Sequence, residues 1–389
     1  MSRKVLVVTG TRAEFGLLRG LMREISDAAG LELQLIATGM HLAPNFGLTY
    51  REIEQAGFSI DIKVDMQLEG DTPSAISKSI GLGMIGFADA YLRLKPDVIV
   101  VLGDRFELLS AVIPALTERI PVAHLHGGEI TEGAFDEAIR HSITKMSHLH
   151  FVGTNEYERR VIQLGENPER VFMVGGLGVD AIKRTCLLNQ KKLEESLGFR
   201  LERRNLMITF HPVTLEQSTS GRQMRELLAA LGKLEDTRLI FTMPNADTGS
   251  DELVEMVEDF VASHPNSRAF SSLGHLRYLS CMSLMDGVVG NSSSGILEAP
   301  SLNVGTINIG DRQKGRLMAD SIINCPPERE AISNAINKLY YPDFKSSLNN
   351  AKNPYGDGGA AARIVNVLEN FDLSGIVKKS FYDIPLSNV

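Results

Sequence analysis

Short apolar runs alternate with segments of helical spacing through almost the whole chain, and this alternation constrains the fold more than any other feature. The first series of apolar runs lies at residues 4–9, 33–38, 97–102, 122–126, 150–153 and 171–174. The second series lies at residues 206–210, 238–242, 268–270, 286–289 and 304–307. Continuous apolar strands that alternate with helices are typical of parallel sheets covered on both faces. The pattern predicts an α/β protein with two doubly wound, Rossmann-like domains.

The domain boundaries are predicted from chain length and from glycines. A chain of 389 residues is too long for one ordinary core. The segment Gly175–Gly178 separates the two series and has the composition of a hinge. We therefore expect a first domain at residues 1–176 and a second at 177–356. A C-terminal segment, 357–389, is predicted to form a helix at 357–370, to cross back to the first domain and to end in a less ordered tail from Ser380.

The composition disfavours several classes of function. The formal net charge is −8 and Lys and Arg form no block, whereas nucleic-acid binding needs a basic face. No apolar run approaches the ~20 residues that span a bilayer, and the first apolar run is too short for a signal peptide. The three cysteines are widely spaced, which suggests neither disulfides nor a zinc site. We expect a cytoplasmic protein with no metal and no cofactor that binds neither nucleic acid nor membranes.

A serine-rich loop, Gly290–Glu298, follows an expected strand and precedes an expected helix start at Ile296. Its backbone N–H groups and the hydroxyls of Ser292 and Ser293 can donate hydrogen bonds, and the positive end of the helix dipole points to the same place. These features are typical of a phosphate-binding site, and Glu298 can accept hydrogen bonds from a sugar. A sugar diphosphate is the first ligand to consider, and a plain helix cap is the alternative.

Polar side chains also follow strands of the first domain. Arg12 lies directly after the first strand, where a guanidinium can pair with phosphate oxygens. Asp104 and Arg105 follow the strand that ends at Leu102. They form either a plain salt bridge or a site in which the carboxylate is free for proton transfer.

The second domain shows the same arrangement. His211 follows the strand 206–210 and can bind phosphate or act on a leaving group. Asn245 follows the next strand and offers amide donors to ribose or phosphate, and Arg312 follows the strand expected at 304–309. Ligands of doubly wound sheets bind outside the carboxyl ends of the strands, so we expect these residues to border a crevice between the domains.

The segment His124-Leu125-His126-Gly127-Gly128-Glu129 is rich in acid/base groups. Two histidines at i and i+2 on a strand share a face, so metal binding is considered, but no third or fourth ligand is evident. The two glycines favour close approach of a ligand instead. His126 and Glu129 are therefore acid/base candidates. Asp136, at the start of the following helix, either stabilises the helix dipole or reaches the same crevice.

A glycine pattern at residues 81–86, GLGMIG, matches the dinucleotide-binding fingerprint by letter. That fingerprint must follow a strand and open a helix, whereas this pattern lies within a helical stretch that precedes a strand. We interpret its glycines as sites of close helix packing.

A strong family resemblance comes from the order and spacing of these motifs. They are GTRAEFG, GDRFELLS, HLHGGE, DEAIRHSITKMSHLH, NADTGSD, GNSSSG, INIGDRQKGR and the closing FYDIP. Over nearly the whole chain they resemble the hydrolysing UDP-N-acetylglucosamine 2-epimerases of bacterial sialic-acid biosynthesis. The resemblance implies two Rossmann-like domains in the glycosyltransferase-B arrangement, with UDP in the cleft between them, and an enzyme that forms homodimers or homotetramers.

The resemblance also implies a reaction in which UDP-N-acetylglucosamine (UDP-GlcNAc) and water give N-acetylmannosamine and UDP. The C2 proton and UDP leave to give 2-acetamidoglucal, and water then adds with inversion at C2. The departing diphosphate needs a positive potential, which the resemblance assigns to Arg12, His211, Ser292 and Ser293. The other implied roles are nucleotide contacts for Asn245 and Glu298, assistance from Arg105 and Arg312, and proton transfer by Asp104 and Asp136.

His126 departs from the pattern of several family members, which have Glu at this position. The role of the C2 base therefore falls either to His126 or to Glu129. The expected catalytic set comprises Asp104, His126, Glu129, Asp136 and His211.

Three other functions fit the sequence. The closely related epimerase of legionaminic-acid synthesis acts on a UDP-linked 2,4-diacetamido-2,4,6-trideoxy sugar and has nearly the same motifs. A glycosyltransferase of the same fold would transfer the sugar intact to an acceptor. A catalytically inactive nucleotide-sugar sensor would have no need of Asp104, Glu129 and Asp136 beside a diphosphate, which argues against it.

Overall fold

The computed structural model describes residues 2–67, 70, 72–131, 135–213, 219–244 and 250–385. These residues form two compact units. The residues of unit 1 fall within Met1–Glu129, Asp136–Ala181 and Tyr355–Val389, and those of unit 2 fall within Ile130–Phe135 and Ile182–Pro354. The chain therefore leaves unit 1 twice, after Glu129 and after Ala181, and returns to it at Asp136 and at Tyr355.

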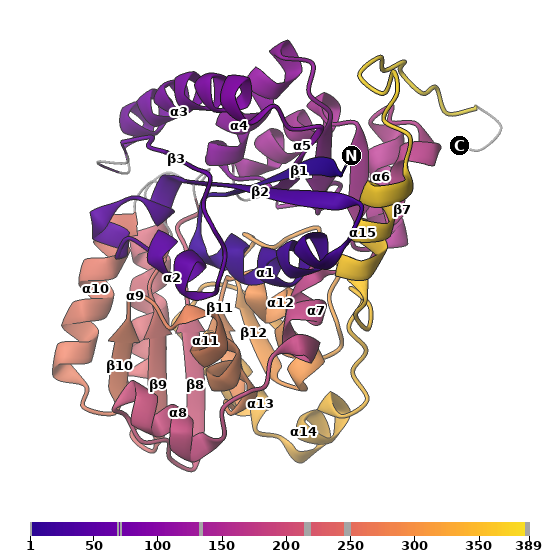
Figure 1. The fold of residues 1–389 in the computed structure, drawn as a ribbon. Helices are drawn as coiled ribbons and strands as arrows, with labels where there is room; N and C mark the ends of the chain where they lie inside the picture. Colours follow the sequence, from indigo (N-terminus) through magenta and orange to yellow (C-terminus); the bar gives the residue numbers. More distant parts are fainter. Residues whose placement is uncertain are drawn as a thin grey trace. The chain divides into compact units, whose positions relative to one another are not determined.

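Unit 1 is built on a parallel sheet (Figure 1). Among its described residues, seven strands lie in the order β3-β2-β1-β4-β5-β6-β7. Their bounds are β1 (Arg3–Thr9), β2 (Leu31–Thr38), β3 (Ile62–Val64), β4 (Val98–Leu102), β5 (Val122–Leu125), β6 (Leu149–Val152) and β7 (Val171–Met173). Side chains alternate along β1, so that Val5 and Val7 enter one apolar core while Leu6 and Val8 enter another.

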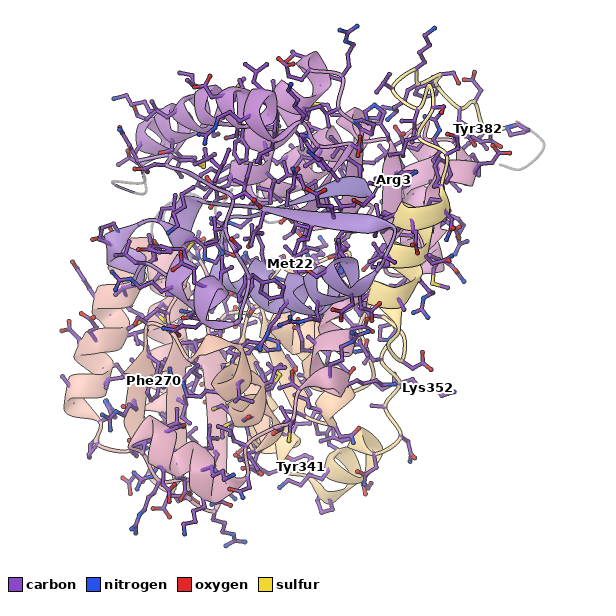
Figure 2. The ribbon with its side chains drawn as sticks, viewed as in Figure 1. Arg3, Met22, Phe270, Tyr341, Lys352 and Tyr382 are labelled. Atoms are coloured by element: carbon purple, nitrogen blue, oxygen red, sulfur yellow. The ribbon has the colours of Figure 1, made fainter. Side chains whose placement is uncertain are left out.

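Helices cover both faces of this sheet. α1 (Arg12–Asp27) and α15 (Ala360–Asn370) pack on the face of Val5 and Val7, where Met22 of α1 is fully buried (Figure 2). The opposite face is covered by α3 (Pro73–Leu94), α4 (Phe106–Thr117) and α5 (Asp136–Met146). The remaining elements are α2 (Tyr50–Gln55), α6 (Asn155–Gln163), the start of α7 (Leu177–Arg184) and the 3₁₀ turns η1 (Gly39–His41), η2 (Pro44–Phe46) and η3 (Pro168–Arg170).

Unit 2 repeats this plan. Its described strands lie in the order β10-β9-β8-β11-β12-β13 and are parallel throughout. Their bounds are β8 (Arg204–Thr209), β9 (Thr237–Thr242), β10 (Ser267–Phe270), β11 (Gly287–Gly290), β12 (Gly305–Ile309) and β13 (Ile322–Cys325). One face carries α9 (Ser220–Leu231), α10 (Ser250–Ser263) and α13 (Arg329–Leu339), and the other carries α8 (Gln190–Leu197) and α11 (Gly274–Ser283). The remaining helices are α12 (Ser294–Leu297), α14 (Pro342–Leu348) and the 3₁₀ turn η4 (Ala299–Leu302).

The predicted pair of parallel sheets with helices on both faces is confirmed. In each sheet the chain order reverses beside the first strand, because β1 lies between β2 and β4, and β8 lies between β9 and β11. The carboxyl ends of β1 and β4, and those of β8 and β11, are therefore neighbours. Doubly wound sheets bind their ligands at such points. In the part of the chain that is described, no helix has the length and apolar character needed to cross a membrane.

Three local predictions need correction. Leu177 opens α7, so the segment Gly175–Gly178 is partly helical. The helix expected from Ile296 is α12, which has only four residues before η4 begins, and so short a helix has little macrodipole. The tail expected from Ser380 is attached at Tyr382, whose N–H donates to the Gly165 backbone oxygen at 2.9 Å, and residues 386–389 of that tail lie outside the described residues.

Candidate functional site

A capping box holds the start of α1 immediately after β1. Thr11 Oγ1 accepts from the Glu14 N–H at 3.2 Å, and Glu14 Oε2 accepts from the N–H groups of Gly10 and Thr11 at 2.7 and 3.2 Å. This turn makes half-buried Arg12 the first residue of α1. Burial, with a further contribution from the Glu107 carboxylate, raises the pKa of Glu14 to about 7.

Arg105, predicted to assist phosphate binding, forms an ion pair with Glu107 in the first turn of α4. Its Nε lies 3.1 Å from Glu107 Oε2, and its Nη2 lies 3.1 Å from Oε1. Glu107 is fully buried, and a buried carboxylate needs a compensating charge. The Arg105 guanidinium therefore has a structural role that the sequence did not reveal, since an acidic residue in the first turn of a helix is ordinary.

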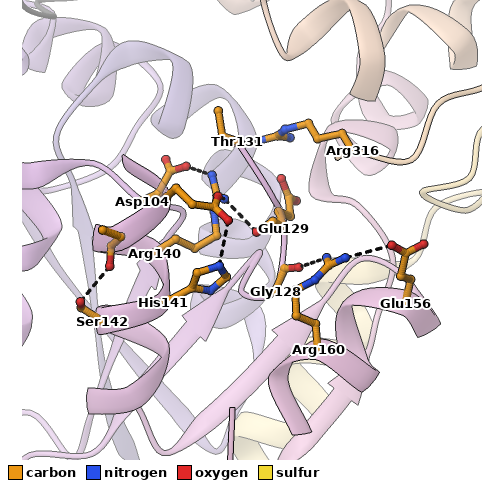
Figure 3. A network of polar contacts seen from close by, with 12 residues as sticks. Asp104, Gly128, Glu129, Thr131, Arg140, His141, Ser142, Glu156, Arg160 and Arg316 are labelled. Atoms are coloured by element: carbon orange, nitrogen blue, oxygen red, sulfur yellow. Dashed lines mark hydrogen bonds and ion pairs between the residues drawn. The ribbon is translucent and has the colours of Figure 1, made fainter. Parts of the chain in front are cut away.

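Arg140 of α5 connects the acid/base candidates of unit 1 (Figure 3). Its Nη2 donates to the Asp104 carboxylate, and its Nη1 donates to the Glu129 backbone oxygen and to Glu137 Oε2, both at 2.8 Å. The residue is 1% exposed, so its charge is compensated inside the protein. Sequence analysis did not select Arg140. The available signal was its spacing of four residues from Asp136, which puts both residues on one side of α5.

His126 and Glu129 form a close pair. His126 Nδ1 lies 3.1 Å from Glu129 Oε1, and the Leu177 N–H points to His126 Nε2 at 3.4 Å. Because Nε2 accepts this bond, we assign the ring proton to Nδ1, which lies next to the Glu129 carboxylate. The backbone of His126 has φ +63°, a left-handed conformation that residues other than glycine rarely adopt. Such strain is concentrated at functional sites.

His124 has a different environment from His126, because β5 ends between them at Leu125. Its Nε2 donates to the Gly103 backbone oxygen at 2.7 Å, and its Nδ1 accepts from Thr144 Oγ1 at 3.1 Å. Burial lowers the pKa of His124 to about 3, so the ring is neutral. His124 thus supports the residue that precedes Asp104. Among the described residues, no three His, Cys, Asp or Glu side chains are grouped so as to hold a metal.

The two glycines after His126 pack closely against other parts of the chain, and the close approach of a ligand to them stays a prediction. A Cβ on Gly128 would lie 2.5 Å from the Tyr157 backbone oxygen, and Gly128 has φ +76°. A Cβ on Gly127 would lie 3.1 Å from His124 Nδ1. The turn that presents Glu129 therefore requires a glycine at Gly128 for steric reasons.

Unit 1 thus brings three predicted catalytic residues together around one arginine. Asp104 and the Glu129 backbone are bonded to Arg140, and His126 is paired with the Glu129 side chain. Asp136 is the half-buried first residue of α5, one turn before Arg140.

Asn291 organises the corresponding edge of unit 2. Its side chain is fully buried and bonds both backbone groups of His211: Oδ1 accepts from the His211 N–H at 2.7 Å, and Nδ2 donates to the His211 oxygen at 2.9 Å. Its own backbone oxygen accepts from Arg312 Nη1 at 3.2 Å and from Gln313 Nε2 at 2.8 Å. Asn291 thereby joins the loops that follow β8, β11 and β12, a role that sequence analysis missed.

The serine loop starts from a strained glycine. Gly290 has φ +139°, and a Cβ there would lie 1.9 Å from the Thr209 backbone oxygen, so no other residue fits. Ser292 and Ser293 are half-buried, and Ser293 makes no side-chain hydrogen bond that caps α12. Ser292 Oγ instead accepts from the N–H of Ser294, the first residue of α12, at 3.4 Å, so part of the capping role considered for this loop is present at Ser292. Glu298 is buried at the end of α12.

Arg316, in the loop after β12, donates to Thr131 Oγ1 at 3.2 Å (Figure 3). Asn245, predicted as a nucleotide contact, lies outside the described residues.

Comparisons with known proteins agree on one family. Residues 23–369 match the family model described as UDP-N-acetylglucosamine 2-epimerase. The chain is 44% identical to the GDP/UDP-N,N'-diacetylbacillosamine 2-epimerase (hydrolyzing) of Campylobacter jejuni, covering 98% of this chain and 99% of the relative. It is 40% identical to polysialic acid biosynthesis protein P7 of Escherichia coli, covering 98% of each. It is 35% identical to the UDP-N,N'-diacetylbacillosamine 2-epimerase (hydrolyzing) of Legionella pneumophila, covering 96% and 97%.

Solved structures show the same fold at lower identity. The UDP-GlcNAc 2-epimerase of Neisseria meningitidis, bound to UDP-GlcNAc, superposes with a TM-score of 0.80 at 19% identity, covering 94% of this chain and 99% of that one. The UDP-GlcNAc 2-epimerase of Methanocaldococcus jannaschii, in complex with UDP-GlcNAc and UDP, superposes with a TM-score of 0.79 at 20% identity, covering 94% of this chain and 99% of that one. The fold is thus the two-domain, glycosyltransferase-B-like α/β fold of these enzymes. The chain belongs to the UDP-N-acetylglucosamine 2-epimerase family.

Proposed function

We propose that the chain is a hydrolysing 2-epimerase whose substrate is a UDP-linked 2,4-diacetamido-2,4,6-trideoxy sugar, N,N'-diacetylbacillosamine. One observation carries this choice: the relative that is 44% identical over 98% of the chain is named for this substrate, and so is the relative that is 35% identical. The motifs had put UDP-GlcNAc first and this sugar second. The identities of the relatives favour the reverse order.

UDP-GlcNAc is the second candidate. It is supported by the 40% identity to the polysialic acid biosynthesis protein P7, which agrees with the motif resemblance to the sialic-acid group. The two substrates differ at C4 and C6 of the sugar, whereas the reaction occurs at C1 and C2. The groups that perform the reaction are therefore expected to be the same for both.

The first step of the reaction is release of the diphosphate. The C2 hydrogen is not adjacent to a carbonyl, so it becomes acidic only as the C1–O bond breaks. Groups of unit 2 suit this step, because His211 and Arg312 are both fixed on Asn291, and the hydroxyls of Ser292 and Ser293 follow directly after it. We assign them to the diphosphate, with Arg12 at the start of α1 as a further cation. Donors fixed before the reaction stabilise a leaving anion with little reorganisation.

The second step is removal of the C2 proton. Both ring nitrogens of His126 have partners within unit 1, namely Glu129 and the Leu177 N–H. We therefore assign the base to the Glu129 carboxylate and give His126 the role of orienting it. Loss of the proton and of UDP leaves a C1–C2 double bond in the sugar.

The third step is addition of water across that double bond. A carboxylic acid delivers a proton to C2 from the opposite face, the oxygen of water joins C1, and one proton of that water passes to a carboxylate, which gives the free epimerised sugar. Asp104, held by Arg140, and Asp136 are the carboxylates that we assign to this step. The overall reaction consumes one water and releases UDP.

The test is turnover of both nucleotide sugars in deuterated water. We expect UDP, and a free sugar with inverted C2 that carries deuterium at C2, from both substrates. We expect kcat/KM to be about 10²-fold higher for the diacetamido sugar, because UDP-GlcNAc has hydroxyls at C4 and C6 where that sugar has an acetamido and a methyl group, and small differences in pocket contacts change kcat/KM by about 10- to 200-fold. The measurements are NMR of the released sugar and continuous detection of UDP.

Each other outcome has a distinct meaning. A higher kcat/KM for UDP-GlcNAc would make the second candidate correct. Release of the epimer still attached to UDP would contradict the hydrolytic reaction. Transfer of an intact sugar to an acceptor, without deuterium at C2, would indicate a glycosyltransferase.

A further inference from the structure

The C-terminal segment is bonded to the rest of unit 1 at several points between α15 and Tyr382. Arg3 of β1 donates to the backbone oxygens of Leu368 and Phe371 in and just after α15. Arg170 Nη1 donates to the Ile376 oxygen at 3.0 Å, and Ile376 is buried in the core of unit 1. Arg3 and Tyr382, which lie near the start and end of these contacts, are labelled in Figure 2. The segment is therefore part of unit 1 and not a loose tail.

Lys379 of this segment caps the C-terminal end of α5. Its Nζ donates to the backbone oxygens of Lys145 and Ser147 at 2.9 and 2.6 Å. The last carbonyl groups of a helix have no partners within the helix, and a cation placed there also interacts favourably with the macrodipole. The capping group of α5 is thus supplied by a residue more than 200 positions later in the sequence.

A buried carboxylate fixes Lys379 in this position. Glu166 is 1% exposed and accepts from Lys145 Nζ at 2.7 Å, from His150 Nε2 at 2.9 Å and from Lys379 Nζ at 2.5 Å. Burial alone would raise the pKa of Glu166, but the hydrogen bonds from His150, Lys145 and Lys379 outweigh it and lower the pKa to about 2. Glu166 is therefore charged, and Lys379 is held by a strong charge-assisted bond.

An aromatic contact adds to this attachment. Lys145 Nζ lies 5.1 Å from the centre of the Phe381 ring. Gly165 also lies against this ring, since a Cβ on Gly165 would lie only 2.3 Å from the edge of the Phe381 ring. Gly165, Lys145 and Phe381 therefore pack in one place, next to the bond between Tyr382 and Gly165.

We propose that Lys379 is a positioning residue for the proposed reaction, because it fixes the helix that carries Arg140. The carbonyls of Lys145 and Ser147 lie about 7 and about 10 Å from Arg140 along the helix direction, at 1.5 Å per residue. Arg140 in turn is bonded to Asp104 and to the backbone of Glu129. A shift of α5 would move Arg140 and these two groups with it. Activity should therefore depend on a C-terminal residue that touches none of the assigned catalytic groups. This inference rests on the proposed function.

The experiment compares Lys379→Met with Lys378→Met in the full-length protein. Lys378 is the adjacent lysine, is exposed, and is a matched control for the loss of one charge. Two readouts are needed: hydrogen–deuterium exchange of the α5 amides, which needs no substrate, and kcat and KM at a temperature where both variants are folded. Lys379→Arg tests whether a cation of similar length restores function.

We expect Lys379→Met to raise amide exchange throughout α5 and to lower kcat about tenfold, because small misplacements of reacting groups have large effects on rate. KM should stay near the wild-type value, since the groups assigned to the diphosphate belong mainly to unit 2. Lys379→Arg should recover most of kcat, and Lys378→Met should match the wild type.

Other results would overturn the proposal in recognisable ways. Equal α5 exchange and equal kcat for Lys379→Met and Lys378→Met would show that Lys379 positions nothing. If Lys379→Met does not fold, Lys379→Gln decides, because glutamine keeps an amide donor but lacks the charge and the length of lysine; wild-type exchange of the α5 amides and wild-type kcat in this variant would contradict the proposal. If the wild-type protein turns over no UDP sugar, the proposed function fails while the exchange experiment still reports on α5.

Discussion

At the scale of single residues, His126 and Glu129 form a pair in which we assign proton transfer to Glu129 and its orientation to His126. His126 holds a left-handed backbone conformation, and both of its ring nitrogens have partners in unit 1. Its neighbour Glu129 has a carboxylate that can accept a proton. A residue that is strained and fully bonded suits orientation better than proton transfer. The pair therefore makes a sharp prediction about which of the two side chains the chemistry needs.

We predict that Glu129→Gln lowers kcat by about 10³-fold, within the range that general-base groups contribute. His126→Asn should lower kcat by no more than about tenfold, because asparagine tolerates the left-handed backbone and keeps a donor for Glu129. The measurement is kcat for UDP release, together with deuterium uptake at C2. A larger loss in His126→Asn than in Glu129→Gln would reverse the assignment.

Glu14 is a second residue whose protonation matters. Burial first, and then the Glu107 carboxylate, raises its pKa from 4.5 to about 7. The folded protein therefore binds this proton more tightly than the unfolded chain does. The stability that Glu14 contributes is complete below pH 4.5 and is lost as the pH rises to 7.

We predict that Glu14→Gln removes this loss. Between pH 5 and pH 8 the free energy of unfolding of the wild type should fall by about 2 to 3 kcal/mol, because each unit of pKa shift corresponds to about 1.36 kcal/mol. The free energy of unfolding of the variant should not show this fall. Denaturant unfolding at the two pH values measures the difference. Glu32→Gln, an exposed change on β2, serves as the control. A constant difference between wild type and Glu14→Gln across this range would show that Glu14 has an ordinary pKa.

At the scale of elements, the central strands were predictable because they are buried on both faces and are continuously apolar. β1, β4 and β8 lie within two residues of their predicted bounds. The edge strands β3 and β13 were missed because they are short and partly exposed, so they lack that signal. In the GLGMIG pattern, Gly83 and Gly86 do pack closely, since a Cβ would meet Ser110 at 2.9 Å and Val64 at 2.7 Å respectively.

The candidate site was predictable only in part. The residues that follow a strand could be found from the sequence, because the carboxyl edge of a parallel sheet is where ligands bind. The residues that hold them could not. Arg140 and Asn291 act through contacts between segments that are far apart in the sequence. Their residue types and spacings are ordinary, and no local pattern distinguishes them from surface residues.

At the scale of the whole molecule, α7, at whose Ala181 the chain passes to unit 2, is bonded to α15, which follows the return of the chain to unit 1 at Tyr355. Gly359 immediately precedes α15 and has no side chain with which to cap the helix. Asp180 of α7 supplies the cap: its two carboxylate oxygens accept from the N–H groups of Ala360 and Ala361 at 3.0 and 2.7 Å. Tyr355 is fastened in the same region by a 2.8 Å bond between its hydroxyl and that of Tyr157. The helix that returns to unit 1 thus depends on the helix through which the chain leaves it.

We predict that Asp180→Ala destabilises unit 1 by about 1 to 2 kcal/mol, the usual effect of losing a helix cap. Asp357→Ala is the matched control, because Asp357 is exposed and lies just before the same helix. Amide exchange should rise in α15 of Asp180→Ala, while the strands of unit 2 keep their wild-type protection, because Asp180 and α15 both belong to unit 1. If exchange rose equally in β8 and α15, the units would unfold together and the effect could not be assigned to the cap. If Asp180→Ala and Asp357→Ala behaved alike, the start of α15 would be held by its apolar contacts alone.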